Sequence, residues 1–222
     1  MKFSAYGVHL LTAVGAALGL WSIILIYDGR YQDAMWILAL AVFIDSIDGT
    51  LARKFHAQKE APKIDGALMD NIIDFTTWTV APLFWAYATM QIPITVLLIC
   101  ATGSILAFSH KESKTQDQFF LGFPSYWNIV VLYLYLLEIP VPYSSAILLL
   151  FALSTVLPVK FIYPTRTPYL KQVTILLGVI FFMQLILLLY LFNESPVLLI
   201  YSSFLFPVYY FGLSFYLNLK HA

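Results

Sequence analysis

The chain has 222 residues, of which 61% are hydrophobic and only 11% are charged. This apolar content exceeds what a soluble core of that size requires, so the composition excludes an ordinary soluble domain and indicates an all-α polytopic membrane protein. The formal net charge is zero, which leaves no global field that would attract nucleic acid. The single cysteine, Cys100, excludes an intramolecular disulfide.

Eight apolar stretches approach the length of a membrane-spanning helix, which is about 20 residues. They cover residues 8–27, 33–53, 66–89, 92–109, 122–138, 142–158, 170–191 and 196–218. The connectors are short and contain the glycines, prolines and asparagines that are typical of turns. We therefore expect one transmembrane domain over residues 1–222. We expect no cleavable signal peptide, because the first stretch is too long for one and further spans follow it.

Basic residues are distributed unequally between the two sets of connectors. Eleven of the twelve lie at the N-terminus, in the tail, or near residues 53–65, 110–121 and 159–171, whereas the opposite side holds only Arg30. Cytoplasmic loops of membrane proteins are enriched in lysine and arginine. We therefore expect both termini, and the connector between the second and third spans, to be cytoplasmic.

Four aspartates interrupt the end of the second expected span and the start of the third. Asp45 and Asp48 are three residues apart and Asp70 and Asp74 are four apart, so each pair shares one helix face. Two such helices facing each other form a cage of carboxylates, which at low dielectric takes up protons or binds cations. Oxygen ligands without histidine or cysteine favour Mg²⁺ or Mn²⁺.

Small and basic residues accompany these carboxylates. Gly49 and Gly66 allow a ligand to approach the backbone closely, and Arg53 is a cation suited to a phosphate. Asp65 is expected to cap the helix that follows it. One intramembrane aspartate is also consistent with a packing contact or a proton relay. Four at these spacings, with both glycines and the arginine, favour a metal and phosphate site.

The sequence from Asp45 to Asp74 resembles the signature of the CDP-alcohol phosphotransferase family, D-x2-D-G-x2-A-R followed by G-x3-D-x3-D. All eight signature residues are present. The spacer between Arg53 and Gly66 has twelve residues, which is longer than usual and is similar to that of the bacterial phosphatidylcholine synthases in this family. The segments Tyr6–Gly15 and Phe119–Asn128 also resemble theirs. The resemblance covers most of the first 130 residues.

The resemblance implies transfer of a phosphatidyl group from CDP-diacylglycerol to choline at the cytoplasmic face of a bacterial inner membrane. It implies two divalent ions, Mn²⁺ or Mg²⁺, on the four aspartates, and it assigns Asp74 as the general base. It is also compatible with a homodimer. The residues that it places beside the donor nucleotide are Gly49, Ala52, Arg53 and Gly66.

The start of the first span adds Thr12 to the residues that the resemblance places beside the nucleotide. Family members often carry Pro-Asn-x-Leu-Thr here; Thr12 matches its last residue, whereas His9 stands where asparagine is usual. A histidine at a membrane entrance is also commonly an interfacial hydrogen-bonding residue. The sequence leaves the role of His9 open.

Aromatic residues gather near the start of the fifth expected span, at Phe119, Phe123, Tyr126 and Trp127. One interpretation is an interfacial belt, because Trp and Tyr are enriched at both membrane surfaces. The other is a cage for the quaternary ammonium of choline, held by cation–π attraction of up to about 2 kcal/mol. The position at a cytoplasmic span start favours the cage.

Two other functions compete with choline transfer. The first keeps the donor and changes the acceptor to serine or glycerol phosphate; a phosphorylated acceptor requires basic residues that the spans lack apart from Arg53. The second is an ion-coupled transporter that uses the aspartates as a cation site. Transporters of that kind commonly have paired halves with broken helices at the bilayer midplane, and this sequence has one polar cluster and no repeat.

Overall fold

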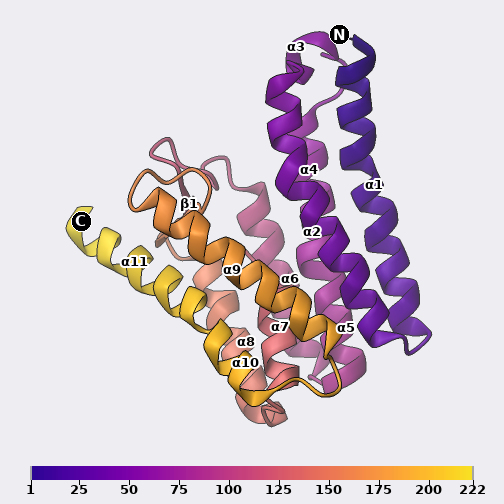
Figure 1. Cartoon of the computed structure of the whole chain (residues 1–222), viewed down its shortest axis with the longest axis vertical. Helices are drawn as coiled ribbons and strands as arrows, with labels where there is room; N and C mark the ends of the chain where they lie inside the picture. Colours follow the sequence, from indigo (N-terminus) through magenta and orange to yellow (C-terminus); the bar gives the residue numbers. More distant parts are fainter. Residues whose placement is uncertain (1, 222) are drawn as a thin grey trace. The chain divides into compact units, whose positions relative to one another are not determined.

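The computed structural model describes residues 2–221, and it describes the side chains of residues 4–220. The regular secondary structure of the described chain is helical apart from two three-residue strands (Figure 1). It divides into two compact units, Met1–Gln91 and Ile92–Ala222. The helical fold class expected from the sequence is confirmed.

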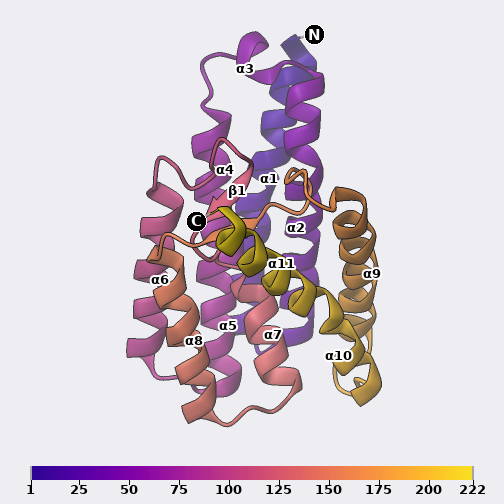
Figure 2. The same cartoon turned by 90° about the vertical axis from the view of Figure 1, so that its left-hand side faces the viewer.

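The first unit is built on two long antiparallel helices, α1 (Lys2–Tyr27) and α2 (Tyr31–Lys54). They are joined by a tight turn in which Gly29 has a φ of 73°, a conformation that glycine adopts without steric cost. Figures 1 and 2 show the two helices side by side. Leu18, Ala41 and Ile44 form the buried apolar contact between them.

The rest of the first unit is a short connector and a second helical segment. The connector contains α3 (Ala57–Glu60), and the segment consists of α4 (Gly66–Asp74), the π-helix η1 (Phe75–Val80) and α5 (Ala81–Met90) in direct succession. The segment expected as the third span is thus helical throughout, but it contains a π-helical stretch that the sequence pattern did not predict. Pro82 follows this stretch and lacks the N–H that an α-helix donates four residues back, which favours irregular backbone before it.

Helix α1 also packs closely on the segment α4–η1. A Cβ atom at Gly15 would lie 2.6 Å from Cγ2 of Ile73, and one at Gly19 would lie 2.9 Å from Cγ2 of Thr76. These two positions accept only glycine without a shift of the neighbouring side chain. Gly15 and Gly19 therefore let α1 approach the segment α4–η1 closely.

The second unit contains the remaining helices and the only two strands of the described chain. Helices α6 and α8 pack together, as do α9 and α11, and β1 pairs antiparallel with β2. Asn218 of α11 donates to the backbone carbonyl of Lys160 and accepts from its N–H, which attaches β2 to this helix. The bounds are α6 Ile94–Ser109, β1 Phe119–Leu121, α7 Trp127–Leu136, α8 Val141–Val156, β2 Lys160–Ile162, α9 Lys171–Tyr190, α10 Val197–Ser203 and α11 Leu205–His221.

The fifth helix expected from hydropathy is shorter than predicted. It was expected at residues 122–138, whereas α7 spans Trp127–Leu136. Gly122 and Ser125 have φ values of 81° and 57°, and Pro124 between them has no N–H to donate. The backbone therefore turns here, and the helix begins only after it.

Four helices of the described residues are long and apolar enough to cross a membrane. They are Ser4–Tyr27, Tyr31–Lys54, Lys171–Tyr190 and Val197–Lys220. Three shorter apolar helices are Ile94–Ser109, Trp127–Leu136 and Val141–Val156. Their length and composition indicate a membrane protein.

Candidate active site

Two of the four aspartates lie in the last turns of α2. The apolar face of this helix is buried as far as Ile44, and Asp45 and Asp48 follow one turn apart. Asp45 is half-buried, whereas Asp48 is only 5% exposed. A carboxylate so deeply buried requires partners for its charge.

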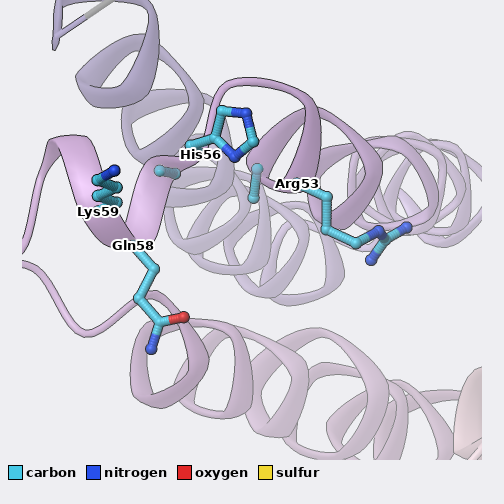
Figure 3. A pocket seen from close by; sticks show the side chains of 6 residues that line it. Arg53, His56, Gln58 and Lys59 are labelled. Atoms are coloured by element: carbon cyan, nitrogen blue, oxygen red, sulfur yellow. The ribbon is translucent and has the colours of Figure 1, made fainter.

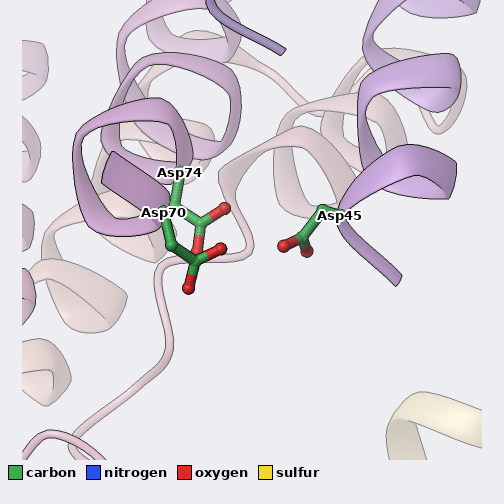
Figure 4. A group of neighbouring side chains, drawn as sticks. All are labelled: Asp45, Asp70 and Asp74. Carbon is green, nitrogen blue, oxygen red and sulfur yellow. The ribbon is translucent and has the colours of Figure 1, made fainter. Parts of the chain in front are cut away.

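The other two aspartates lie on α4. The side chain of Asp65 accepts a hydrogen bond of 3.0 Å from the N–H of Leu68, which confirms that Asp65 caps this helix. The helix begins at Gly66 and presents Asp70 and Asp74 one turn apart. Figure 4 shows their carboxylates directed toward that of Asp45 on the other helix. One oxygen from each of these three residues lies within 4.8 Å of the others.

All four aspartates line one narrow cavity inside the first unit. Its volume is about 10 Å³, close to the space that one small ion or water occupies. Asp48 is not one of the three residues in the tight oxygen group, and its Oδ2 accepts a 2.7 Å hydrogen bond from the hydroxyl of Thr12. The lining residues are Thr12, Gly15, Ala41, Ile44, Asp45, Asp48, Asp70, Ile73, Asp74 and Thr77.

The donor set of this cavity fits a small divalent cation. Three half-buried carboxylates with converging oxygens offer the hard ligands that Mg²⁺ and Mn²⁺ prefer. Without a cation, like charges this close in a partly buried site repel one another strongly. The residues Asp45, Asp70 and Asp74 therefore could hold a metal ion, and Asp48 lines the same cavity.

The remaining signature residues lie near the ends of α2 and α4. Arg53 donates from Nη2 to the hydroxyl of Thr50 at 3.0 Å, and its Nη1 lies 3.5 Å from the position of a Cβ atom at Gly49. The guanidinium is therefore folded back toward Gly49. At Gly66, a Cβ atom would lie 3.0 Å from Cε1 of His9, so this imidazole occupies the space beside the glycine.

A larger open pocket of about 490 Å³ begins at Ala52 and Arg53 and continues over the connector after α2. Its other lining residues are His56, Ala57, Gln58 and Lys59, none of which is acidic. In Figure 3 the side chains of Arg53 and Lys59 extend in different directions from this pocket. Signature residues thus border a space of the size that small-molecule ligands occupy.

The four aromatic residues expected to contact the acceptor lie in the second unit. Phe119, Phe123 and Trp127 are at most 3% exposed, and Nε1 of Trp127 donates to the hydroxyl of Ser104 at 2.7 Å. Tyr126 is half-buried and stands edge-on to Phe123 with 6.1 Å between ring centroids. Three of the rings therefore contribute to an aromatic core, and Tyr126 is the one with appreciable exposure.

Sequence reasoning missed one neighbour of the carboxylates and one contact of a signature glycine. Thr77 of η1 is 2% exposed and lines the cavity, with its hydroxyl donating to the carbonyl of Ile73 at 3.0 Å. Its only sequence signal is the spacing of three residues from Asp74, which in a helix places both side chains on one face. The contact of His9 with Gly66 joins residues far apart in the chain and leaves no local signal.

Comparison with known proteins gives consistent matches across most of the chain. The family model for CDP-alcohol phosphatidyltransferases matches residues 8–209. A phosphatidylcholine synthase of Legionella pneumophila is 39% identical over 181 residues, which are 78% of this chain and 70% of that protein. One of Legionella bozemanae is 34% identical over 212 residues, or 90% of this chain and 98% of that protein. One of Borreliella burgdorferi is 34% identical over 180 residues, 79% of this chain and 77% of that protein.

Proposed function

Because the chain belongs to the CDP-alcohol phosphatidyltransferase family, we propose that it transfers a phosphatidyl group from CDP-diacylglycerol to choline, which yields phosphatidylcholine and CMP. The observation that carries the proposal is the convergence of signature aspartates from α2 and α4 on one cavity. The choice of choline is supported by similarity to phosphatidylcholine synthases over more than two thirds of both chains.

The four aspartates are the proposed ligands of two divalent ions, Mn²⁺ or Mg²⁺. When bound, such ions neutralise charge on the phosphates of the donor and on the departing CMP. The two ions would be held at the polar end of α2 by the carboxylates of Asp45, Asp48, Asp70 and Asp74. The buried surroundings of the cavity strengthen each of these charge interactions.

Asp74 is the proposed general base. Its carboxylate takes the proton from the hydroxyl of choline while the alcohol oxygen forms a new bond to phosphorus. The bond between this phosphorus and the oxygen of CMP breaks at the same centre, and CMP leaves. Asp74 is suited to this role because it is only half-buried, so an acceptor can reach it.

The donor nucleotide is proposed to occupy the space bordered by Gly49, Ala52, Arg53 and Gly66. The pocket of about 490 Å³ that begins at Ala52 and Arg53 supports this placement. Arg53 can exchange its hydrogen bond with Thr50 for one with a phosphate oxygen, because both bonds use the same guanidinium N–H groups.

The proposed acceptor site uses aromatic rings to bind the ammonium of choline. Tyr126 is the principal candidate, since its ring is half-buried, and Phe119, Phe123 and Trp127 pack behind it as support. A methylated ammonium has no N–H to donate, so ring faces and apolar contact are the means of selecting it.

The proposed setting is a bacterial inner membrane, with the chain working as one functional domain, in a homodimer as the family resemblance suggests. The eight apolar stretches of the sequence support eight spans. The distribution of basic residues supports cytoplasmic termini and an active site toward the cytoplasm. The three shorter apolar helices and the continuous segment α4–η1–α5 provide the four spans beyond the four longest helices.

The test is to offer purified protein CDP-diacylglycerol, Mn²⁺ and a panel of alcohols. Release of CMP that depends on choline, with formation of phosphatidylcholine, is the expected result. Release of CMP with serine or glycerol phosphate, but not with choline, would show that the acceptor is one of these other alcohols. No release with any alcohol would overturn the enzymatic function and favour a transporter.

A further inference from the structure

The hydroxyl of Thr12 makes a contact that the sequence does not predict. It lies 2.7 Å from Oδ2 of Asp48 and 3.3 Å from the carbonyl oxygen of Val8. A hydroxyl has one proton, and a charged acceptor at the shorter distance receives it. Thr12 and Asp48 are 8% and 5% exposed, so water competes little for this bond.

The bond matters because the terminal torsion of an aspartate is loosely restricted. Rotation about that bond is broad, so a carboxylate without a fixed partner can turn its oxygens away from a site. A donor on one oxygen fixes the plane of the group and therefore the direction of the other oxygen. Thr12 can do this, since its β-branched side chain is confined to two rotamers within a helix and its hydroxyl lies 2.7 Å from Oδ2 of Asp48.

Helix α1 holds Thr12 rigidly against both helices that carry the aspartates. On one side, Leu18 packs on Ala41 and Ile44 of α2. On the other side, Ile73 of α4 packs against Gly15, where the Cβ atom of any larger residue would clash with the Ile73 side chain. The position of the Thr12 hydroxyl is thus set by packing on both sides of the cavity.

We propose that Thr12 is a positioning residue that orients the carboxylate of Asp48 toward the cation site. This inference rests on the proposed metal-dependent function, and it replaces the nucleotide contact that the family resemblance implies for Thr12. In this role Thr12 acts through Asp48, which accepts the hydrogen bond from its hydroxyl. Partners of this kind fix the geometry of metal ligands and contribute to affinity for the metal.

The experiment is titration of purified full-length protein in detergent with Mn²⁺, with free Mn²⁺ measured by electron paramagnetic resonance. Thr12→Val keeps the shape and removes the hydroxyl, and it should weaken Mn²⁺ binding by about tenfold or more, as loss of an outer partner does in other metal sites. Thr12→Ser keeps the hydroxyl and should bind Mn²⁺ within about threefold of the native protein. At saturating Mn²⁺ the KM for CDP-diacylglycerol should be unchanged in both variants.

A matched control is available on the same helix. Ser22 is fully buried and its hydroxyl donates to the carbonyl of Gly19 at 2.8 Å, so Ser22→Ala removes a buried hydroxyl that does not contact an aspartate. Its Mn²⁺ affinity should equal that of the native protein. If Thr12→Val does not fold, Thr12→Ser compared with Thr12→Cys serves instead, because a thiol of similar size is a weak donor.

Two results would overturn the inference. Native Mn²⁺ affinity in folded Thr12→Val or Thr12→Cys would show that the hydroxyl does not orient Asp48. A raised KM for CDP-diacylglycerol with unchanged Mn²⁺ affinity would instead support the contact between Thr12 and the nucleotide that the family resemblance implies. If the native protein itself binds no Mn²⁺, both the proposed metal site and this inference are wrong. That result differs from the other two, in which the native protein does bind Mn²⁺.

Discussion

The imidazole of His9 lies against Gly66, the first residue of α4. A Cβ atom at position 66 would be 3.0 Å from Cε1 and 3.4 Å from Nδ1 of this ring. His9 is 6% exposed, and its Nε2 has no hydrogen-bond partner among the described residues. The signature glycine thus has a structural neighbour within the chain, in addition to any ligand that approaches it.

This contact predicts coupling between the two positions. Gly66→Ala should force the ring of His9 to shift by a few tenths of an ångström, a steric cost that opposes the higher helix propensity of alanine. His9→Ala should remove most of that cost, so the double variant should melt well above the value that additivity predicts. Thermal unfolding of the four proteins measures the coupling.

Gly7→Ala is the matched control, because a Cβ atom at Gly7 would meet nothing within 4 Å. Alanine is favoured over glycine in a helix, so this change should not lower stability. Strictly additive effects at positions 9 and 66 would contradict a direct contact.

Removal of divalent metal should abolish turnover. The reason is the convergence of three carboxylate oxygens within 4.8 Å, whose mutual repulsion a bound cation offsets. After treatment with EDTA, Mg²⁺ or Mn²⁺ should restore activity, whereas Ca²⁺ should restore little, because it requires longer bonds and more ligands than this narrow cavity offers. Asp70→Ala should remain inactive at any metal concentration. Full activity in EDTA would exclude the metal site.

The Asp74→Asn variant separates proton transfer from binding. It keeps the shape of the side chain and removes the proton acceptor, so kcat should fall by a factor of at least about 10². Binding of CDP-diacylglycerol should fall much less. Asp65→Asn is the control, since asparagine also caps a helix and the change removes one neighbouring negative charge. Equal losses of donor binding and turnover in Asp74→Asn would make Asp74 chiefly a metal ligand.

Local patterns predicted the framework of the site well. The spacing of the aspartates placed Asp45 and Asp48 at the end of one helix and Asp70 and Asp74 at the start of another, as observed. The cap at Asp65 was also predicted, because its side chain bonds to the N–H only three residues later. Periodicity and capping depend on neighbours in sequence, which is why they can be read from it.

Contacts between distant segments left no such pattern. The bond from Thr12 to Asp48 joins residues 36 positions apart, and β1 pairs with β2 through Phe120 and Phe161, about 40 residues apart. Hydropathy alone also does not distinguish an α-helix from η1, because hydropathy reports apolar content and not the hydrogen-bond pattern of the backbone. In retrospect, Pro82 and the threonines whose hydroxyls bond to backbone carbonyls are the signals of irregular backbone there.

The ion pair between Lys160 and Asp117 predicts a small pH dependence of stability. The hydrogen bond from the Lys160 ammonium, at 2.7 Å, lowers the pKa of Asp117 from its usual range. A carboxyl whose pKa is lower in the folded state stabilises the fold at neutral pH and loses that contribution as pH falls through the folded pKa. The side chains of Lys160 and Asp117 are 38% and 53% exposed, so solvent screens the pair and its contribution is at most about 1 kcal/mol.

Asp117→Asn should therefore lower Tm slightly at pH 7, and the difference from the native protein should shrink below about pH 4. In a Lys160→Met background the same change should have a smaller effect, because only the weaker hydrogen bond with Thr115 then favours the carboxylate. A difference in Tm that grows toward acid pH would contradict the assignment.

An aromatic acceptor site should distinguish choline from alcohols that lack its charge. Choline and 3,3-dimethylbutanol have nearly the same shape, but only choline is charged, whereas ethanolamine is charged and unmethylated. If an aromatic face binds the ammonium, loss of the charge should lower kcat/KM about tenfold or more, equivalent to about 1–2 kcal/mol. Tyr126→Leu should raise the KM for choline and reduce the discrimination between choline and the neutral analogue.

The control must account for the aromatic core around Tyr126. Trp127 is fully buried and bonded to Ser104, so its truncation would test folding rather than recognition. Phe211→Leu removes another half-buried ring of the same cluster and should leave choline discrimination intact. Equal use of the neutral analogue by the native protein, or native discrimination in Tyr126→Leu, would show that these rings serve packing and the membrane interface instead.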